Sequence, residues 1–192
     1  MHVLALGLAA LIGTAGQHAA AAPHREAERA REERLARLRE QARIRLEQDR
    51  TRFTAAEFAD IESRYRSAFL NDLPMFAAPG GTEILAELIR LYPTSNRAGC
   101  AALHVRRGQG VDRELRLKQI IADYSDAWCE SGVQVGALAR ALLAVHYVEL
   151  DRFDEAERLA AEVSARYPGS IDDAGAPLDD LLNGLRLLRV RK

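Results

Sequence analysis

The sequence predicts an all-α protein made of successive helix pairs, and three observations favour this fold class. Long runs rich in Ala, Leu, Glu and Arg, all strong helix formers, are separated by stretches that contain glycine and proline. Apolar residues in these runs recur at helical spacing, and few segments alternate with the period of a strand. Three segments also resemble one another, which is typical of helical repeat proteins.

The composition is that of a globular chain of one domain. Of its 192 residues, 48% are hydrophobic and 29% are charged, enough to build a core and too apolar for a disordered chain. The formal net charge of -1 gives no overall attraction to nucleic acid or to an anionic membrane. We therefore expect a partner other than a nucleic acid.

The first 21 residues read as a signal peptide. Residues 3–12 are apolar, and Ala19 and Ala21 are the small residues that signal peptidase requires for a cut after Ala21. The segment departs from the usual pattern because no Lys or Arg precedes the apolar run. Retention as a short anchor stays open as the alternative. We predict a periplasmic or secreted chain that does not span a membrane once the signal is removed.

Residues 22–53 form a charge-dense segment, which we interpret as a solvated helical spacer. Its arginines are nearly balanced by glutamates, which disfavours nucleic-acid binding. The alternative is a coiled coil that makes the protein a structural homo-oligomer. Leu35, Leu38 and Ala42 would fit the seam of such a coil, but Arg45 and Asp49 then interrupt it.

The predicted helical domain occupies residues 54–192. Thr54 and Glu57 have the spacing of a capping box, which predicts a helix start at Thr54. A break at 71–81 contains two prolines and two glycines and ends that first helical region. At the other end, Pro177 can begin a helix with a leucine stripe, suited to capping a stack.

Between these ends the chain repeats itself. The segments TEILAELIRLYPTS (82–95), LRLKQIIADYSD (115–126) and ERLAAEVSARYPGS (157–170) align so that Tyr92, Tyr124 and Tyr167 share one column. Each is preceded by another helical segment, at roughly 58–70, 96–107 and 134–149. Pairs this short bury their apolar faces only by stacking on neighbouring pairs.

The best of these units, residues 137–168, resembles the tetratricopeptide repeat (TPR) family. Its first helix has Leu143 and Ala144 at the Leu-Gly position and Tyr147 at the aromatic position, while Ala156 and Pro168 match the second helix. The resemblance implies a TPR-like α-solenoid of about three helix pairs with an N-terminal charged helix and a C-terminal capping helix. It also implies a non-enzymatic scaffold of the bacterial cell envelope that binds a peptide or partner protein along the inner face of its first helices.

Several residues of the first helices and of one long connection are candidates for partner binding. Arg97 and Arg140 could bind a carboxylate, although solvated guanidinium groups are the alternative. Trp128 lies in the insertion 125–137, where a partner contact and packing against the next repeat are equally expected. The groove itself is expected to be apolar. The candidate partner-binding residues are Asn96, Arg97, Trp128, Leu138, Arg140 and Val145.

The residue types with most chemistry are Cys100 and His104, which lie four apart and share one helix face. In the repeat frame both fall on packing positions, and we favour a core cysteine there. A disulfide between Cys100 and Cys129 is the main alternative, but it is disfavoured by the depth of Cys100 within its helix. Zinc held with His146, or a Cys–His nucleophile, is a weaker alternative. No hydrolase, phosphate-loop or dinucleotide motif is present, so we predict neither an enzyme nor a bound cofactor or metal.

Overall fold

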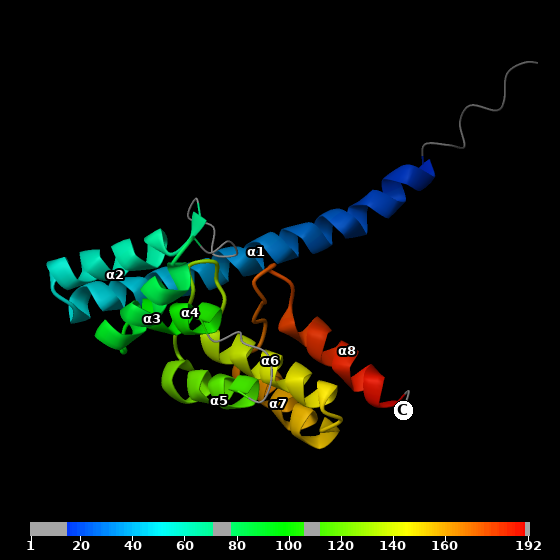
Figure 1. Cartoon of the computed structure of the whole chain (residues 1–192). Coiled ribbons are helices and arrows are strands. Elements are labelled where there is room, and N and C mark those ends of the chain that lie inside the picture. Colours follow the sequence, from blue (N-terminus) through cyan, green and yellow to red (C-terminus); the bar gives the residue numbers. More distant parts are fainter. Residues whose placement is uncertain (1–14, 71–77, 106–111, 191–192) are drawn as a thin grey trace, which may run out of the picture. The chain divides into compact units, whose positions relative to one another are not determined.

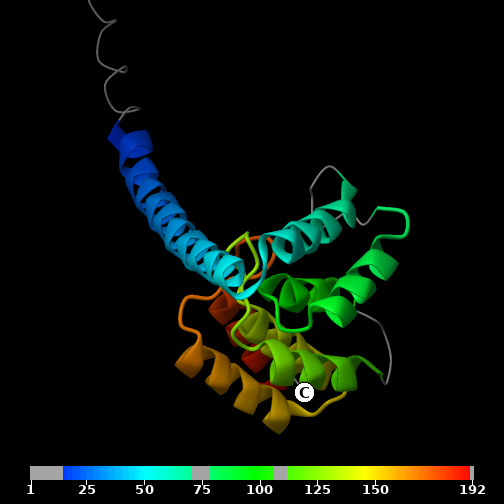
Figure 2. The ribbon, with the colours of Figure 1, turned by 90° about the vertical axis from the view of Figure 1, so that its left-hand side faces the viewer.

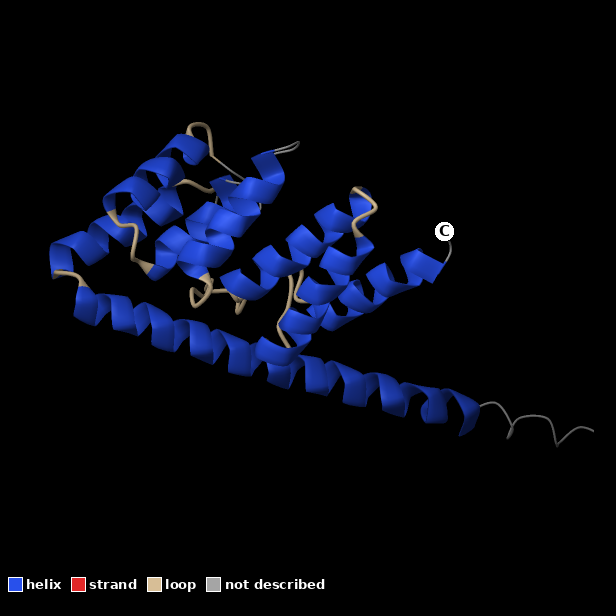
Figure 3. Ribbon diagram, turned by 90° about the horizontal axis from the view of Figure 1, so that it is seen from below, coloured by secondary structure: helices blue, strands red, loops and turns tan. Residues whose placement is uncertain are grey.

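The prediction of an all-α fold is confirmed. The computed structural model describes residues 15–70, 78–105 and 112–190, with the backbone alone at residues 15–24 and 185–190. Within these ranges every regular element is a helix (Figures 1 and 3). The apolar run of the predicted signal peptide lies outside them. The helices are α1 (Ala15–Arg52), α2 (Ala55–Ser67), α3 (Gly81–Leu91), α4 (Asn96–Val105), α5 (Asp112–Tyr124), α6 (Val135–Glu149), α7 (Phe153–Arg166) and α8 (Leu178–Val190).

The chain divides into two units, Met1–Ala36 and Arg37–Lys192, and the boundary falls within α1. In the first unit, side chains 25–33 are all exposed, as the high charge of this segment predicts. In the second unit, α1 is part of the packed domain, because Ala42 is fully buried and Asp49 is only 3% exposed. Ala42, which would fit the seam of the alternative coiled coil, and Asp49, which interrupts it, are therefore both buried within a single chain. No helix in the described ranges has both the length and the apolar character needed to cross a bilayer.

The predicted capping box is present at the start of α2. The Thr54 hydroxyl accepts a hydrogen bond from the backbone N–H of Glu57, and the Glu57 carboxylate accepts one from the backbone N–H of Thr54 at 2.8 Å. Two N–H groups that lack partners within the helix are satisfied in this way. The capping box thus fixes the start of α2, three residues after the end of α1.

The helices of the second unit pack in chain order. Each of α2 to α7 contacts the next helix, and the first helices of the pairs also contact one another, α2 with α4, α4 with α6 and α6 with α8 (Figures 1 and 2). The apolar faces meet in one core, as expected for helices that cannot bury those faces alone. Its fully buried members include Ile61, Leu88, Leu103, Ile120, Val163 and Leu178.

The tyrosine column of the sequence corresponds to one recurring structure. Tyr92 and Tyr167 end α3 and α7 with nearly the same backbone angles, φ/ψ of -129°/56° and -132°/49°. Tyr124 is the last residue of α5. In all three cases the tyrosine carbonyl accepts a hydrogen bond from the N–H three residues later, at 3.0–3.1 Å; the donors are Ser95, Ala127 and Ser170. The same hydrogen bond therefore closes the turn after each second helix, although the third turn differs in placing Gly169 at a positive φ of 75°.

After that turn, two of the connections form the same small hairpin. The insertion identified between α5 and α6 recurs between α7 and α8, displaced by 43 residues along the chain. Both contain one isolated antiparallel bridge, Trp128 with Gln134 and Ile171 with Pro177. A glycine with positive φ turns each hairpin, Gly132 at +94° and Gly175 at +76°. The backbone hydrogen bonds also correspond. Written from the N–H donor to the carbonyl acceptor, they are Cys129 to Val133, Gly132 to Cys129 and Val135 to Ala127 in the first hairpin. In the second they are Asp172 to Ala176, Gly175 to Asp172 and Leu178 to Ser170.

Candidate functional site

The two cysteines form a disulfide. Cys100 lies in α4 and Cys129 in the α5–α6 hairpin, with Cα atoms 5.5 Å apart. Cys100 is fully buried, so its predicted core position is confirmed, whereas the favoured free thiol is wrong. The depth of Cys100 in its helix is no obstacle, because the hairpin folds back along α4. The covalent bond therefore fastens the α5–α6 hairpin to α4.

The two histidines that were candidates for a zinc site pack separately. The ring of His104 meets Phe69 edge to face, with centroids 5.0 Å apart. His146 is 8% exposed, and its Nδ1 lies 3.6 Å from the carboxylate of Glu149. In the described ranges no three His, Cys, Asp or Glu side chains are grouped to hold a metal ion. Both sulfur atoms proposed as zinc ligands are used by the disulfide.

Arg97 was expected either to bind a partner's carboxylate or to be solvated, but it lies inside the protein. Its side chain is 2% exposed, and Nε and Nη2 donate to the two carboxylate oxygens of Glu62 at 2.6 and 2.8 Å. Nη2 also donates to Glu130 at 2.9 Å, and the guanidinium stacks 4.5 Å from the ring of Tyr65. Burial disfavours the charged form, but the bonds to Glu62 outweigh it and raise the pKa of Arg97. This arginine joins α4 to α2.

Arg140 is likewise internal, contrary to the expectation of a partner-facing or solvated guanidinium. It is 4% exposed and donates to Glu162 of α7 at 2.8 Å and to the Gly136 carbonyl at 2.9 Å. Leu138 is also buried, at 3% exposure. Of the candidate partner-binding residues, only Trp128 and Val145 retain intermediate exposure. The structure does not bring the candidates together on one open groove.

Asn96 has a structural role that its type did not reveal. Its side-chain amide donates to the carbonyl of Trp128 and accepts from the N–H of Trp128 at 2.7 Å, so it pairs with the hairpin as another strand residue would. Its own backbone N–H, in the first turn of α4, donates to the carboxylate of Asp49 at 2.6 Å. The α4 N-terminus is thereby capped from another helix, 47 residues earlier in the chain.

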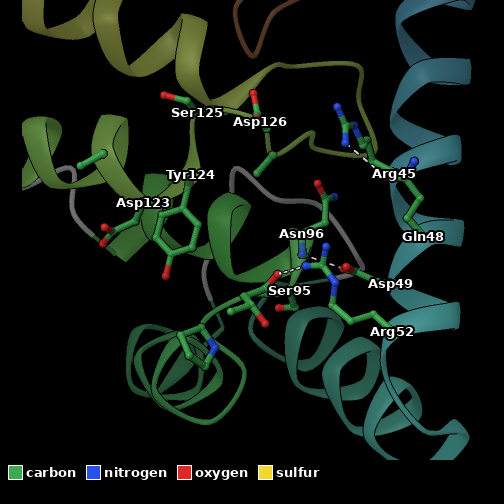
Figure 4. Close-up of a pocket in the computed structure, with 14 residues that line it drawn as sticks. Arg45, Gln48, Asp49, Arg52, Ser95, Asn96, Asp123, Tyr124, Ser125 and Asp126 are labelled. Carbon is green, nitrogen blue, oxygen red and sulfur yellow. Dashed lines mark hydrogen bonds between the residues drawn. The ribbon is translucent and has the colours of Figure 1, made fainter.

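Asp49 and Asn96 also line a polar cleft (Figure 4). Its volume is about 350 Å³, and three segments form it: the last turns of α1, the α3–α4 turn, and the end of α5 with the following loop. All three belong to the second unit. The lining residues are Arg45, Gln48, Asp49, Arg52, Pro93, Thr94, Ser95, Asn96, Ala122, Asp123, Tyr124, Ser125, Asp126 and Ala127.

Charged residues of both signs line the cleft, and the α1 wall also holds the buried Asp49. Arg45 and Arg52 belong to α1, whereas Asp123 and Asp126 lie across the cleft on α5 and the loop that follows it (Figure 4). Arg52 is anchored by a 2.8 Å hydrogen bond to the Thr94 carbonyl, which ties the two walls together. The cleft therefore offers the exposed guanidinium donors of Arg45 on the α1 side and the carboxylate acceptors of Asp123 and Asp126 on the other.

Asp49 lies on the same stretch of α1 and is nearly enclosed. Burial raises its pKa, and the hydrogen bond from the Asn96 N–H together with the nearby Arg52 only partly compensates. The hydroxyl of Ser125, also in the lining, donates to the Ile121 carbonyl and accepts from Arg140 at 3.2 Å. That serine therefore has the Arg140 guanidinium as its cationic neighbour.

The cleft residues of α1 were missed because they were assigned to a solvated spacer. The only sequence signal was negative: Arg45 and Asp49 interrupt the coiled-coil seam, and these are two of the residues that line the cleft.

Comparisons of the chain with protein-family models, with curated proteins and with solved structures found no match.

Proposed function

We propose that this protein is a non-enzymatic binding module of the bacterial cell envelope, built as a TPR-like solenoid of three helix pairs. The observation that carries the proposal is the ordered contact of α2, α4, α6 and α8. Alternate helices that meet in chain order build an array in which each repeat depends on its neighbours. The hydrogen bond that the carbonyls of Tyr92, Tyr124 and Tyr167 each accept from the N–H three residues later supports the same interpretation. Arrays of this kind present long surfaces to other proteins.

An exported location is part of the proposal. The disulfide between Cys100 and Cys129 supports it, because such bonds persist in oxidising compartments and are rare in the cytosol. The apolar start of the chain and the small residues before Ala22 have the form of an export signal. In this interpretation the mature protein works in the periplasm and binds a peptide or a partner protein there.

The test is photocrosslinking in the native bacterium. A benzophenone amino acid replaces, one at a time, four exposed residues on different elements, namely Gln48, Leu91, Leu115 and Ala165. We expect a discrete adduct from at least one position, in the periplasmic fraction, that disappears when unmodified protein is present in excess. Adducts absent from all four positions, or a protein found reduced in the cytosol, would overturn the proposal.

A further inference from the structure

The polar cleft is lined by arginines of α1 and by aspartates at the end of α5 and in the loop that follows it. We propose that it binds an ampholytic peptide segment, one that carries a carboxylate and a cationic side chain within a few residues. This inference rests on the proposed function, since it specifies the partner chemistry of a binding module. It also replaces the apolar ligand expected from the sequence, because the cleft lining is polar and charged.

The α1 wall can receive the carboxylate. Arg45 and Arg52 are seven residues apart, two helical turns, so they lie on the same face of α1 about 10 Å from each other along its axis. Each guanidinium has five N–H donors. Arg45 uses one on Gln48 at 3.2 Å, and Arg52 uses one on the Thr94 carbonyl. The remaining donors suit a carboxylate, which arginine can bind in bidentate geometry.

The opposite wall can receive the cation. Asp123 accepts a single hydrogen bond, from the Gln119 amide at 2.8 Å. Asp126 is exposed and has neither a hydrogen-bond nor an ion-pair partner in the part of the chain that the structure describes. The carboxylates of Asp123 and Asp126 therefore lack a cationic partner among the described residues, although Arg45 and Arg52 line the same cleft. A lysine or arginine of a bound segment would supply that charge.

The frame around these charges is held by contacts between distant segments. The Asp49 carboxylate accepts the N–H of Asn96, the Asn96 side chain pairs with the backbone of Trp128, and the Arg52 guanidinium donates to the Thr94 carbonyl. The shape of the cleft is thus fixed by hydrogen bonds that bridge 32 to 47 residues, and the disulfide fastens the same hairpin. A preformed site spares the ligand the cost of ordering the protein.

A peptide fits the size and charge of this site better than other ligand classes do. A volume of about 350 Å³ accommodates two or three side chains, at the lower end of small-ligand sites. Nucleic acid would place phosphates against Asp123 and Asp126, and like charges at contact are repulsive. Since an extended peptide alternates its side chains, it can direct one charge to each wall.

Isothermal titration of the full chain tests the inference with a defined probe, acetyl-Gly-Glu-Gly-Gly-Lys-Gly-amide. We expect a dissociation constant below about 1 mM at low salt. Two matched probes replace the glutamate by glutamine or the lysine by norleucine, and each should bind at least fivefold more weakly. Amide shifts in the NMR spectrum should be confined to the last turns of α1, the α3–α4 turn and the end of α5.

Two protein variants locate the binding. Arg45→Gln and Asp126→Asn should each weaken the charged probe at least fivefold while leaving the circular dichroism and melting temperature unchanged, since both side chains are exposed. The matched controls, Arg158→Gln on α7 and Asp180→Asn on α8, should bind like the parent protein. Equal binding of charged and neutral probes, or of cleft and control variants, would overturn the inference.

Absence of binding up to 5 mM probe would also overturn it, and the crosslinking experiment then separates the two proposals. Adducts obtained through Leu91, Leu115 or Ala165, but not through Gln48, would leave the binding module intact with a different contact surface. Absence of adducts from all four positions would remove the proposed function as well.

Discussion

The carboxylate of Asp49 accepts the backbone N–H of Asn96 at 2.6 Å, so the last turns of α1 provide the cap for α4. Removing the acceptor by Asp49→Ala should lower the free energy of unfolding by about 1–2 kcal/mol, as for other helix caps. Asp49→Asn keeps an acceptor oxygen and should stay within about 0.5 kcal/mol of the parent. Urea denaturation measures both, with Glu47→Ala on the exposed side of α1 as the control.

The raised pKa of Asp49 adds a pH dependence to this comparison. Because burial favours the protonated form in the folded state, the parent gains stability as the pH falls through that raised pKa. Asparagine has no such titration. If Asp49→Asn has a higher free energy of unfolding than the parent at neutral pH, this difference should therefore shrink in acid. A difference that grows in acid would contradict the raised pKa of Asp49.

Loss of the carboxylate charge should destabilise the protein much more at Glu62, which pairs with the buried Arg97, than at the exposed Glu130. Glu62→Gln leaves the guanidinium enclosed without its main counter-charge and should cost about 3 kcal/mol. Glu130 contacts the same arginine but its side chain is 68% exposed, so Glu130→Gln should cost less than about 1 kcal/mol. Combining Arg97→Met with Glu62→Gln should cost less than the sum of the two single changes. Similar effects at Glu62 and Glu130 would show that burial does not govern this pair.

Close backbone approach makes Gly136 irreplaceable at the start of α6. A Cβ there would collide with the carbonyl oxygen of Ser125 and lie 2.7 Å from its Cα. Gly136→Ala should therefore destabilise the protein by about 2 kcal/mol or more. Gly184 in α8 is the matched helical glycine with open space around its Cα, so Gly184→Ala should stabilise by up to about 1 kcal/mol. Thermal melts of the two variants should move in opposite directions.

Glu114 should contribute to acid denaturation. Hydrogen bonds from Lys118, Tyr147 and Arg152, at 2.6 to 2.9 Å, lower its pKa to about 2. A lowered carboxyl pKa gives stability above the usual value of 4.5, and this stability is lost as the pH falls toward 2. Glu114→Gln should cost about 1–2 kcal/mol at pH 7 and much less at pH 3. A pH-independent difference would contradict this; urea is the suitable denaturant because it does not screen charge.

Local patterns predicted the elements well. The helix start at Thr54 and the recurring tyrosine turns depend on neighbours within a few residues, and both are present. The roles of Arg97, Arg140 and Asp49 depend on partners 35, 22 and 47 residues away, which no local pattern contains. Residue type alone therefore suggested exposed arginines where the structure has internal ion pairs. The second hairpin could have been found, since Gly132 and Gly175 are separated by the same 43 residues as Tyr124 and Tyr167.

The two hairpins share a backbone but are secured by different chemistry. In the first, Cys129 is bonded to α4; in the second, Asp172 occupies the corresponding position and its carboxylate accepts the N–H groups of Ala174 and Ala176 at 2.8–2.9 Å. A thiol reagent can act on only one of them. In reducing surroundings the α5–α6 hairpin would loosen first. Amide hydrogen exchange would then accelerate around residues 125–134, while residues 168–177 would keep their protection. A protein released to the cytosol would thus lose the connection that forms one wall of its cleft before it lost its helices.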